Sequence, residues 1–283
     1  MVILYIILGI LALLASLFLY TLYPGPRRST APFDRQFIAH RGLHTEDGEA
    51  PENSLTSFVR AHQAGYAVEL DIQFTADKQI VVFHDKTLSR VCGVDKRVDE
   101  LTYAELSALS LQGGMEHIPL LRDALETLVD TPLVCEIKSY GGISDTSLCA
   151  AAAPILKTYR GPLCVESFNP FMVRWFYKNQ PDIIRGILST NFEDVDEVTR
   201  WQGIALSALM TNFLTRPDFI AYDYEYRHHR AFRLCRRLYR PTTIAWTITN
   251  REQENVALKT FDNCIFEQYY PRHRVTPQGG NLK

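Results

Sequence analysis

Two short apolar segments each carry a pair of charged side chains spaced two residues apart. Glu69 and Asp71 lie in the segment VELDIQF, and Glu136 and Lys138 lie in VCEIKS. Residues i and i+2 of a strand share one face, and buried charges are costly unless they are paired or bind a metal. Each pair taken alone has a simpler explanation: Glu136 and Lys138 could form an ion pair, and Glu69 and Asp71 could be two solvent-exposed acids. Three carboxylates at one place would instead require a cation, and oxygen ligands suit a hard divalent ion. We predict that Glu69, Asp71 and Glu136 bind one such cation, Ca²⁺ or Mg²⁺.

Two histidines end apolar runs of their own. His40 follows the run FIA, and His84 follows IVVF. Two histidines beside a metal site can act as an acid and a base on opposite sides of a phosphate, and the pattern leaves open which is which. Arg41 and Lys138 would add the positive charge that a phosphodiester requires. The sequence has no GxxxxGK(S/T) loop to cradle a nucleoside triphosphate. We expect three other histidines to lack a carboxylate partner and to be structural: His44, His62 and His117.

Short apolar runs alternate with helix-length amphipathic segments through most of the chain. In residues 55–62, three apolar residues and His62 fall at i, i+3, i+4 and i+7, and Gly65 supplies a helix stop. This alternation predicts a parallel sheet with right-handed crossovers, and about 255 residues suit one barrel. We predict an α/β fold, a (β/α)8 TIM barrel, with strands at 37–39, 66–70, 133–137, 163–165, 183–188, 219–222, 243–246 and 264–266.

One segment breaks the alternation. VELDIQFTADKQIVVFHD holds two strand patterns joined by a turn at residues 75–79. That connection is too short for the crossover that parallel strands need. We predict an inserted β-hairpin that folds residues 81–84 back beside residues 69–71, so that His84 lies near the carboxylates.

The first segment of the chain is apolar throughout. Residues 2–23 carry no charge, and a rise of about 1.5 Å per residue makes them long enough to cross a hydrocarbon core of about 30 Å. The basic n-region of a signal peptide is missing, whereas Arg27, Arg28 and Arg35 follow the segment. We predict one uncleaved N-terminal transmembrane helix at 1–23, a short stiff linker at 24–35 and the barrel at 36–283. The positive-inside tendency predicts a single-pass protein of the cell membrane with its barrel in the cytoplasm.

Composition excludes other classes of protein. The chain has 30 Lys and Arg against 32 Asp and Glu, a balance that argues against a nucleic-acid partner. Its six cysteines form no CxxC pair. We expect them to be reduced, buried, small hydrophobic side chains, not a disulfide framework or a zinc site.

Several motifs, taken in order, resemble the glycerophosphodiester phosphodiesterase family from about residue 37 to 270. They are IAHRG, PENS, VELDIQFTADKQIVVFHD, CEIK, ESFNP and AWTITN. The resemblance implies a TIM-barrel phosphodiesterase that cleaves glycerophosphodiesters to an alcohol and glycerol 3-phosphate. The site residues that it implies are the metal ligands Glu69, Asp71 and Glu136, the acid–base pair His40 and His84, and Arg41 and Lys138 on the phosphate.

The resemblance also extends to weaker positions. Phe168 and Trp246 match aromatic residues near the substrate glycerol, although packing in the barrel core would explain them equally well. In the PEN element, we expect Asn53 to cap the following helix and Glu52 to bond within the site. The last strand departs from the family, because CIFEQYYP offers Glu267 or the glutamine after it where family members often carry Asp.

Two other functions remain open at this stage. An anchored barrel could be a lysophospholipase D that acts on lysolipids in the bilayer. A barrel without activity could serve as a lipid-binding scaffold, although the three carboxylates and both histidines argue against that function. Hydrolysis of a phosphodiester with and without divalent metal would separate the enzymes from the scaffold.

One late segment, RHHRAFRLCRRLYR at residues 227–240, combines an apolar stripe with many arginines. We expect Ala231, Leu234, Cys235 and Leu238 to pack on the barrel, since they repeat at i, i+3, i+4 and i+7. A solvated outer helix is the plainer explanation of the arginines, and contact with an anionic membrane leaflet is the alternative that the anchor favours. These arginines are Arg230, Arg233, Arg237 and Arg240.

Overall fold

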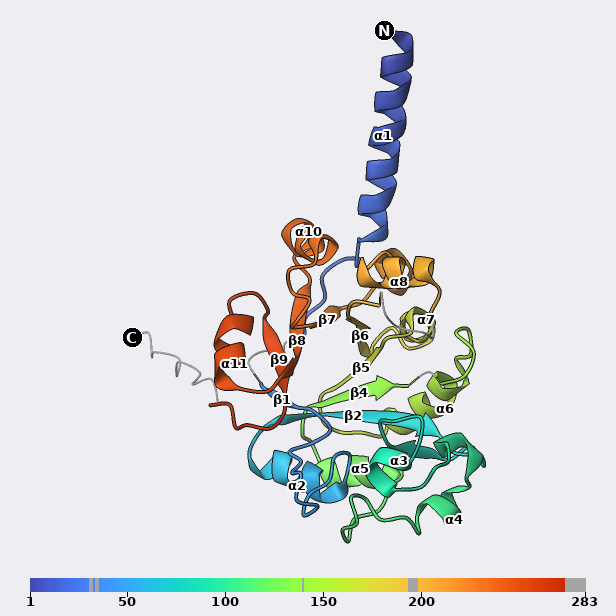
Figure 1. Cartoon of the computed structure of the whole chain (residues 1–283), viewed down its shortest axis with the longest axis vertical. Helices are drawn as coiled ribbons and strands as arrows, with labels where there is room; N and C mark the ends of the chain where they lie inside the picture. Colours follow the sequence, from blue (N-terminus) through green and yellow to red (C-terminus); the bar gives the residue numbers. More distant parts are fainter. Residues whose placement is uncertain (31–32, 34–35, 139, 193–197, 273–283) are drawn as a thin grey trace.

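Eight parallel strands close into a barrel within the residues that the computed structural model describes, which are 1–30, 33, 36–138, 140–192 and 198–272. The order is β1-β9-β8-β7-β6-β5-β4-β2, and β1 (Ile38–Ala39) also pairs with β2 (Ala67–Phe74), which completes the ring. Helices surround the strands, and α1 (Val2–Thr21) projects away from them (Figure 1). The predicted (β/α)8 TIM barrel is confirmed. Arg35 and residues 273–283 of the predicted segments lie outside the described residues.

The other elements follow in chain order. The strands are β3 (Ile80–Val82), β4 (Leu133–Ile137), β5 (Leu163–Ser167), β6 (Ile184–Ser189), β7 (Phe219–Asp223), β8 (Thr242–Ile248) and β9 (Asn263–Phe266). The helices are α2 (Leu55–Gln63), α3 (Ser89–Cys92), the 3₁₀ helix η2 (Val98–Glu100), α4 (Tyr103–Leu106), α5 (Leu121–Leu128), α6 (Ser147–Leu156), α7 (Pro170–Asn179), α8 (Arg200–Ser207), α9 (Asn212–Thr215), α10 (Arg230–Tyr239) and α11 (Arg251–Ala257).

Strand β2 has alternating side chains with different surroundings. Val68, Leu70 and Ile72 are fully buried and belong to the hydrophobic cluster that packs the strands against the helices. Glu69 and Asp71 alternate with them and therefore project from the opposite face, toward the barrel interior. The strand period thus brings the acids inside.

The hairpin forms as predicted. β3 pairs antiparallel with β2, with Ile72 opposite Val82 and Phe74 opposite Ile80. Because β3 runs back along β2 toward the level of Asp71, the following residue His84 reaches the mouth of the barrel. There His84 lines the same cavity as Glu69.

The N-cap of helix α2 is Ser54, one residue after the expected cap Asn53. Ser54 has extended backbone, and its hydroxyl oxygen accepts a hydrogen bond from the Ser57 amide at 3.1 Å. Asn53, at a φ of 56°, instead donates from Nδ2 to Asp71 Oδ2 at 2.8 Å. The expectation that Asn53 caps the helix is therefore wrong, because its amide is engaged with a buried carboxylate inside the barrel.

The segment between α1 and β1 packs against the strands. The hydroxyls of Thr30 and Thr242 are 3.2 Å apart, and Asn263 Nδ2 donates to the Phe33 carbonyl at 2.9 Å. Phe33 is buried among inward-facing side chains such as Ala67 and Ile265. The described part of the predicted linker thus covers the end of the barrel at which the strands begin.

Helix α10 buries a slightly different stripe from the one expected. Ala231 and Cys235 are buried and Leu234 is half-buried, but Leu238 is 48% exposed. Phe232 occupies the core in its place and stacks on Tyr222, with ring centroids 4.2 Å apart. The expected packing of Leu238 is wrong, because the buried stripe is displaced toward Phe232.

Candidate active site

The three predicted metal ligands come together at the mouth of the barrel. Glu69, Asp71 and Glu136 each offer an oxygen atom, and these atoms all lie within 4.8 Å of one another. Asp71 and Glu136 are direct neighbours in the register of β2 and β4. All three are buried, so they form an oxygen-rich group shielded from solvent.

Lys138 is held by two of these carboxylates. Its Nζ lies 2.8 Å from Asp71 Oδ1 and 2.7 Å from Glu136 Oε1. Burial alone would raise the pKa of Asp71, but Lys138, His84 and Arg41 together lower it below its usual range. Burial raises the pKa of Glu136 despite Lys138. Burial opposes the charge of Lys138, yet Asp71 and Glu136 raise its pKa above the usual value.

The donor set fits a divalent cation. Glu69 Oε2 accepts a hydrogen bond from the Arg41 amide at 2.9 Å, whereas Glu69 Oε1 has no hydrogen-bond partner among the described residues. Burial and the charges of Asp71 and Glu136 raise the pKa of Glu69 well above its usual value. A buried carboxylate oxygen without a donor beside two further carboxylates is the arrangement that a hard cation would stabilise.

A fourth acid, Glu166 on β5, lies beside this group and was not predicted. It pairs with Glu136 in the strand register, and it is only 2% exposed. Burial and the Glu136 charge raise its pKa well above the usual value. The sequence did carry a signal, because Glu166 directly follows the apolar run at residues 163–165.

His40 is bonded to Glu267, the residue that stands where family members often carry Asp. Its Nδ1 is 2.6 Å from Glu267 Oε2, and its Nε2 is 4.0 Å from Glu69 Oε2. Burial lowers the pKa of His40, which Glu267 partly offsets. Burial would raise the pKa of Glu267, but His40 and His44 lower it below the usual range. Glu267 is therefore ionised, and Nδ1 of His40 donates to it.

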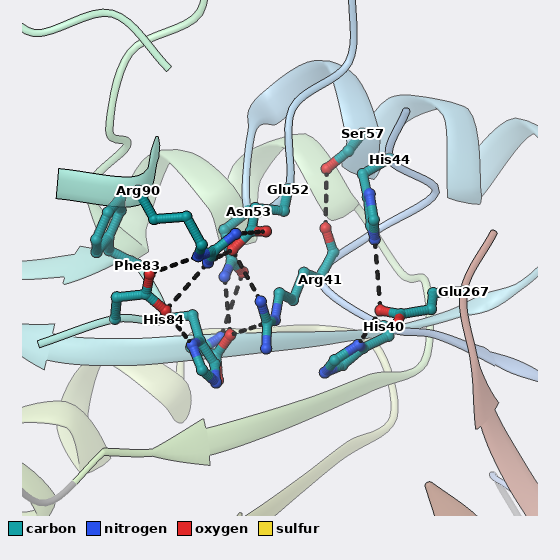
Figure 2. Close-up of polar contacts among 12 residues, drawn as sticks. His40, Arg41, His44, Glu52, Asn53, Ser57, Phe83, His84, Arg90 and Glu267 are labelled. Atoms are coloured by element: carbon teal, nitrogen blue, oxygen red, sulfur yellow. Dashed lines mark hydrogen bonds and ion pairs between the residues drawn. The ribbon is translucent and has the colours of Figure 1, made fainter. Parts of the chain in front are cut away.

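One expectation about the other histidines is wrong. His44 was expected to lack a carboxylate partner, yet its Nε2 lies 3.8 Å from Glu267 Oε2 (Figure 2). The contact joins residues that are distant in the sequence, and the closed barrel brings β1 beside β9. His62 and His117 lie outside the cavity; they bond the Thr131 hydroxyl and the Leu109 carbonyl, respectively.

His84 has a carboxylate partner of its own. Its Nδ1 is 2.6 Å from Asp85 Oδ1, and its carbonyl accepts a hydrogen bond from the Tyr140 hydroxyl. Burial would raise the pKa of Asp85, but His84 and Arg90 lower it below the usual range. Asp85 is therefore ionised and holds the proton on Nδ1 of His84.

Arg41 lies between the two histidine groups (Figure 2). Its Nη1 donates to Glu52 Oε1 at 2.9 Å, and its Nε is 3.6 Å from Asp71 Oδ2. Arg90 makes two more bonds to Glu52, each 2.7 Å long. Glu52 thus bonds within the site as expected, and it fixes the Arg41 guanidinium next to the carboxylates.

The cavity above these residues has a volume of about 520 Å³ and is lined by most of the predicted site residues. Phe168 and Trp246 line it and pack edge to face, with ring centroids 5.4 Å apart. Both also pack against the inner core. Their positions are therefore compatible both with a place near the substrate and with a role in core packing. Among the described residues, Asp71 and Lys138 do not line this cavity; Lys138 lines two neighbouring ones.

Gly42, after Arg41, has a backbone and a packing environment that exclude other residues. Its φ is +80°, and an added Cβ would lie 2.3 Å from Ser57 Oγ and 2.9 Å from Phe58 Cδ1. Gly93 has a similar φ of +70°, but no described atom lies within 4 Å of its Cβ position. We expect Gly93→Ala to cost about 1–2 kcal/mol for its backbone alone. Gly42→Ala should cost clearly more, because helix α2 must also shift. Thermal unfolding of both variants measures the difference; equal losses would contradict the packing argument.

Comparison with known proteins agrees with this geometry. The model of the glycerophosphoryl diester phosphodiesterase family matches residues 40–262. The human protein "Lysophospholipase D GDPD1" is 32% identical over 187 residues, which are 60% of this chain and 57% of that protein. The glycerophosphodiester phosphodiesterase of Caldanaerobacter subterraneus is 31% identical over 166 residues, 53% of this chain and 65% of that protein. The matches thus span less than two thirds of either relative.

Solved structures share the fold. A phosphodiesterase from Oleispira antarctica, in complex with the product sn-glycerol-3-phosphate, has a TM-score of 0.68 and 26% identity, covering 85% of this chain and 95% of that one. The family match includes β2 through β8 and nearly all of the acidic and histidine groups described above. The chain therefore belongs to the glycerophosphoryl diester phosphodiesterase family.

Proposed function

We propose that this protein hydrolyses glycerophosphodiesters to an alcohol and glycerol 3-phosphate, with one divalent cation, Ca²⁺ or Mg²⁺, held by Glu69, Asp71 and Glu136. The observation that carries the proposal is the buried group of three carboxylates beside a cavity that His40 and His84 both line. Family membership supports it, as does the product found in the Oleispira antarctica phosphodiesterase.

The two histidines divide the proton transfers of the reaction. An oxygen nucleophile forms the new P–O bond while the bond to the alcohol breaks. Attack by water gives glycerol 3-phosphate directly, whereas attack by a neighbouring glycerol hydroxyl gives a cyclic phosphate that water opens in a second step. One histidine accepts the proton of the nucleophile, and the other donates a proton to the departing alcohol oxygen. Because Glu267 and Asp85 hold Nδ1 of the two rings, Nε2 is the exchanging atom in each.

Positive charge meets the phosphate from the protein and from the cation. Arg41 lines the cavity and Lys138 lies beside it, so both can stabilise the negative charge of the diester. A divalent cation at the carboxylates would neutralise charge that develops on the phosphate oxygens. A panel of diesters, assayed on the full chain with and without divalent metal, tests the function. Hydrolysis of none of them would favour the scaffold alternative.

Glu267 acts as a positioning residue for His40, and its replacement should show which role His40 has. Glu267 raises the pKa of His40 against the lowering effect of burial. Glu267→Gln removes that charge, so the pKa of His40 should fall and the ring should lose its proton at a lower pH. If His40 is the base, the acidic limb of the pH–rate profile moves to lower pH; if it is the acid, the alkaline limb does.

A matched control for this change lies at the rim of the same cavity. Glu46 is exposed there, and Glu46→Gln removes the same charge without a contact to His40 among those described. Its pH profile should keep both limbs. Unmoved limbs in Glu267→Gln would rule out the positioning role.

A second candidate function, lysophospholipase D activity, is favoured by an apolar cavity next to the first. This cavity of about 570 Å³ shares Glu136 and Phe168 with the catalytic cavity. Polar side chains such as Lys86 and Asn169 also line it, but its larger apolar part would suit an acyl chain attached to the glycerol, and the human relative carries that activity in its name. The apolar side chains that line it are Ile137, Ile143, Phe168, Pro170, Phe192, Val198 and Leu206.

Competition between two substrates tests this candidate. Lysophosphatidylcholine should have a lower KM than glycerophosphocholine, since only the lysolipid fills the apolar cavity. Leu206→Asn should raise KM for the lysolipid alone, whereas Ile155→Asn on α6, away from the site, should change neither value. Equal KM values for both substrates would exclude an acyl-chain site here.

We further propose that α1 is a single membrane span with the barrel on the cytoplasmic side. Among the described residues it is the one helix long and apolar enough to cross a membrane. Arg27 and Arg28 follow it, as the positive-inside tendency requires. Leu22, directly after the helix, is fully buried against the barrel, which supports a helix that stays attached. Resistance to alkaline extraction tests the span, and protection from protease added outside intact cells tests the side.

A further inference from the structure

The C-terminal end of α1 is hydrogen-bonded to the barrel and is not joined to it by a flexible linker alone. Leu22 is fully buried, and its carbonyl accepts a hydrogen bond from Asn212 Nδ2 at 3.1 Å. The Tyr239 hydroxyl donates to the Leu19 carbonyl at 2.7 Å. These contacts tie the end of the helix to α9 and α10.

Aromatic contacts complete the junction. The rings of Tyr20 and Phe213 lie 5.5 Å apart, and those of Tyr23 and Tyr239 lie 5.4 Å apart. The Arg216 guanidinium lies over the Tyr23 ring at 5.4 Å. With bonds on two sides, α1 has a fixed direction relative to the barrel, so a membrane around α1 must meet one particular face.

That face carries exposed apolar side chains. Figure 1 shows α8 and α10 on the side of the barrel from which α1 projects. Trp201 on α8 is 79% exposed, and Ile204, one turn further, is 42% exposed. On α10, Leu238 is the exposed apolar residue described above. Tryptophan and aliphatic side chains of this kind are typical of the interface between membrane and water.

The α10 part of this face is basic. Arg230, Arg233 and Arg237 on α10 are all exposed, and their spacing of i, i+3 and i+7 puts them on one side of the helix. The helix contains no acidic residue. This charge complements the anionic lipids of a cytoplasmic leaflet.

From these contacts we infer that the α8–α10 face, defined by Trp201, Ile204, Leu238 and the three arginines, lies on an anionic lipid bilayer. The inference rests on the proposed span. Contact there would also hold the apolar cavity close to the lipid, because Val198, just before α8, and Leu206, in the last turn of α8, line that cavity. The barrel would thus have a fixed orientation on the membrane, with the apolar cavity between the lipid-facing side and the active site.

Tryptophan fluorescence of the full chain in proteoliposomes tests the contact. Lipids with brominated acyl chains should quench Trp201, so Trp201→Phe should lose most of the quenching. Trp175→Phe is the matched control, because Trp175 is half-buried on α7 and packs on Phe176. Trp201→Phe should not change hydrolysis of soluble glycerophosphocholine. If Trp201→Phe leaves the quenching unchanged, Trp201 does not reach the acyl chains and the inference is overturned.

Charge reversal tests the lipid type. Changing Arg230, Arg233 and Arg237 to Glu should reduce Trp201 quenching in anionic bilayers to its level in neutral ones, and high salt should do the same to the unchanged protein. The control reverses the same number of exposed charges on the α5–α6 side of the barrel, at Arg122, Lys157 and Arg160.

The outcomes separate the two proposals. If alkali extracts the protein from membranes, both the proposed membrane span and the proposed contact of the α8–α10 face with the bilayer are contradicted. If the protein resists extraction but Trp201 is not quenched, only the face falls. If the control variant loses quenching as fully as the α10 variant, net charge and not this face determines the contact, which also overturns the inference.

Discussion

Glu69→Gln and Glu136→Gln should each abolish diester hydrolysis while the barrel remains folded. Each change removes one charge from a group whose ligand atoms lie within 4.8 Å of one another. A hard cation depends on the number and charge of its oxygen ligands, so the loss of one should abolish metal-dependent activity. Initial rates before and after EDTA, and after Ca²⁺ or Mg²⁺ is added back, measure the effect. Full activity in either variant, or activity that EDTA leaves unchanged, would sink the metal assignment.

Glu69→Gln should also raise the unfolding temperature when no metal is present. Burial and the charges of Asp71 and Glu136 raise the pKa of Glu69 well above its usual value. A group of this kind stabilises the fold below its unfolded pKa, and that stability is lost as pH rises through the folded pKa. At a pH above the folded pKa, Gln therefore removes a cost, and the gain in Tm should shrink as pH falls. Added cation should raise the Tm of the unchanged protein more than that of the variant.

Glu166→Gln is the matched control for both measurements. Glu166 is as buried as Glu69, at 2% exposure, and lies next to Glu136, but it is outside the group of three. Its raised pKa keeps it neutral over a wider pH range, a state that Gln imitates. The variant should keep its metal-dependent rise in Tm. Loss of that rise would mean that Glu166 is a fourth ligand.

Local periodicity explains why much of the site could be predicted from the sequence. The spacing of Glu69 and Asp71 in an apolar strand puts both on the inner face, and the short turn before β3 requires the hairpin that carries His84. These inferences need only the strand period and the minimum length of a crossover. Glu166 was missed although the same period applies to it, because it lies at the edge of its apolar run.

Contacts between distant parts of the chain could not be predicted in this way. His44 meets Glu267 only because β1 and β9 close the barrel, and no local pattern carries that information. The role of Asn53 also depended on the fold. As a residue next to a helix it suits a cap, but the barrel puts its amide beside the buried Asp71, where a donor is required. Leu238 was misassigned since helical spacing does not show which side of a stripe meets the barrel.

His40→Ala and His84→Ala should each lower kcat by about 10²–10⁴-fold, because each removes one of two proton transfers. The variants should differ when the leaving group is changed. The nitrophenolate of a nitrophenyl diester leaves without being protonated. This substrate should therefore rescue only the variant that lacks the acid. His84 is our choice for the acid: its side chain is 30% exposed, against 16% for His40, whose Nε2 lies near Glu69. A departing alcohol at the open side of the cavity would meet His84 first.

His62→Ala is the control for this pair. His62 is half-buried and bonds the Thr131 hydroxyl outside the cavity, so its loss should leave kcat unchanged for both kinds of leaving group. Rescue of His40→Ala instead of His84→Ala would reverse the two roles while preserving their division. Equal rescue of both variants, or of neither, would contradict it. A nucleophile and a leaving group on opposite sides of the phosphorus require one histidine each, and each of the two histidines has a carboxylate partner of its own.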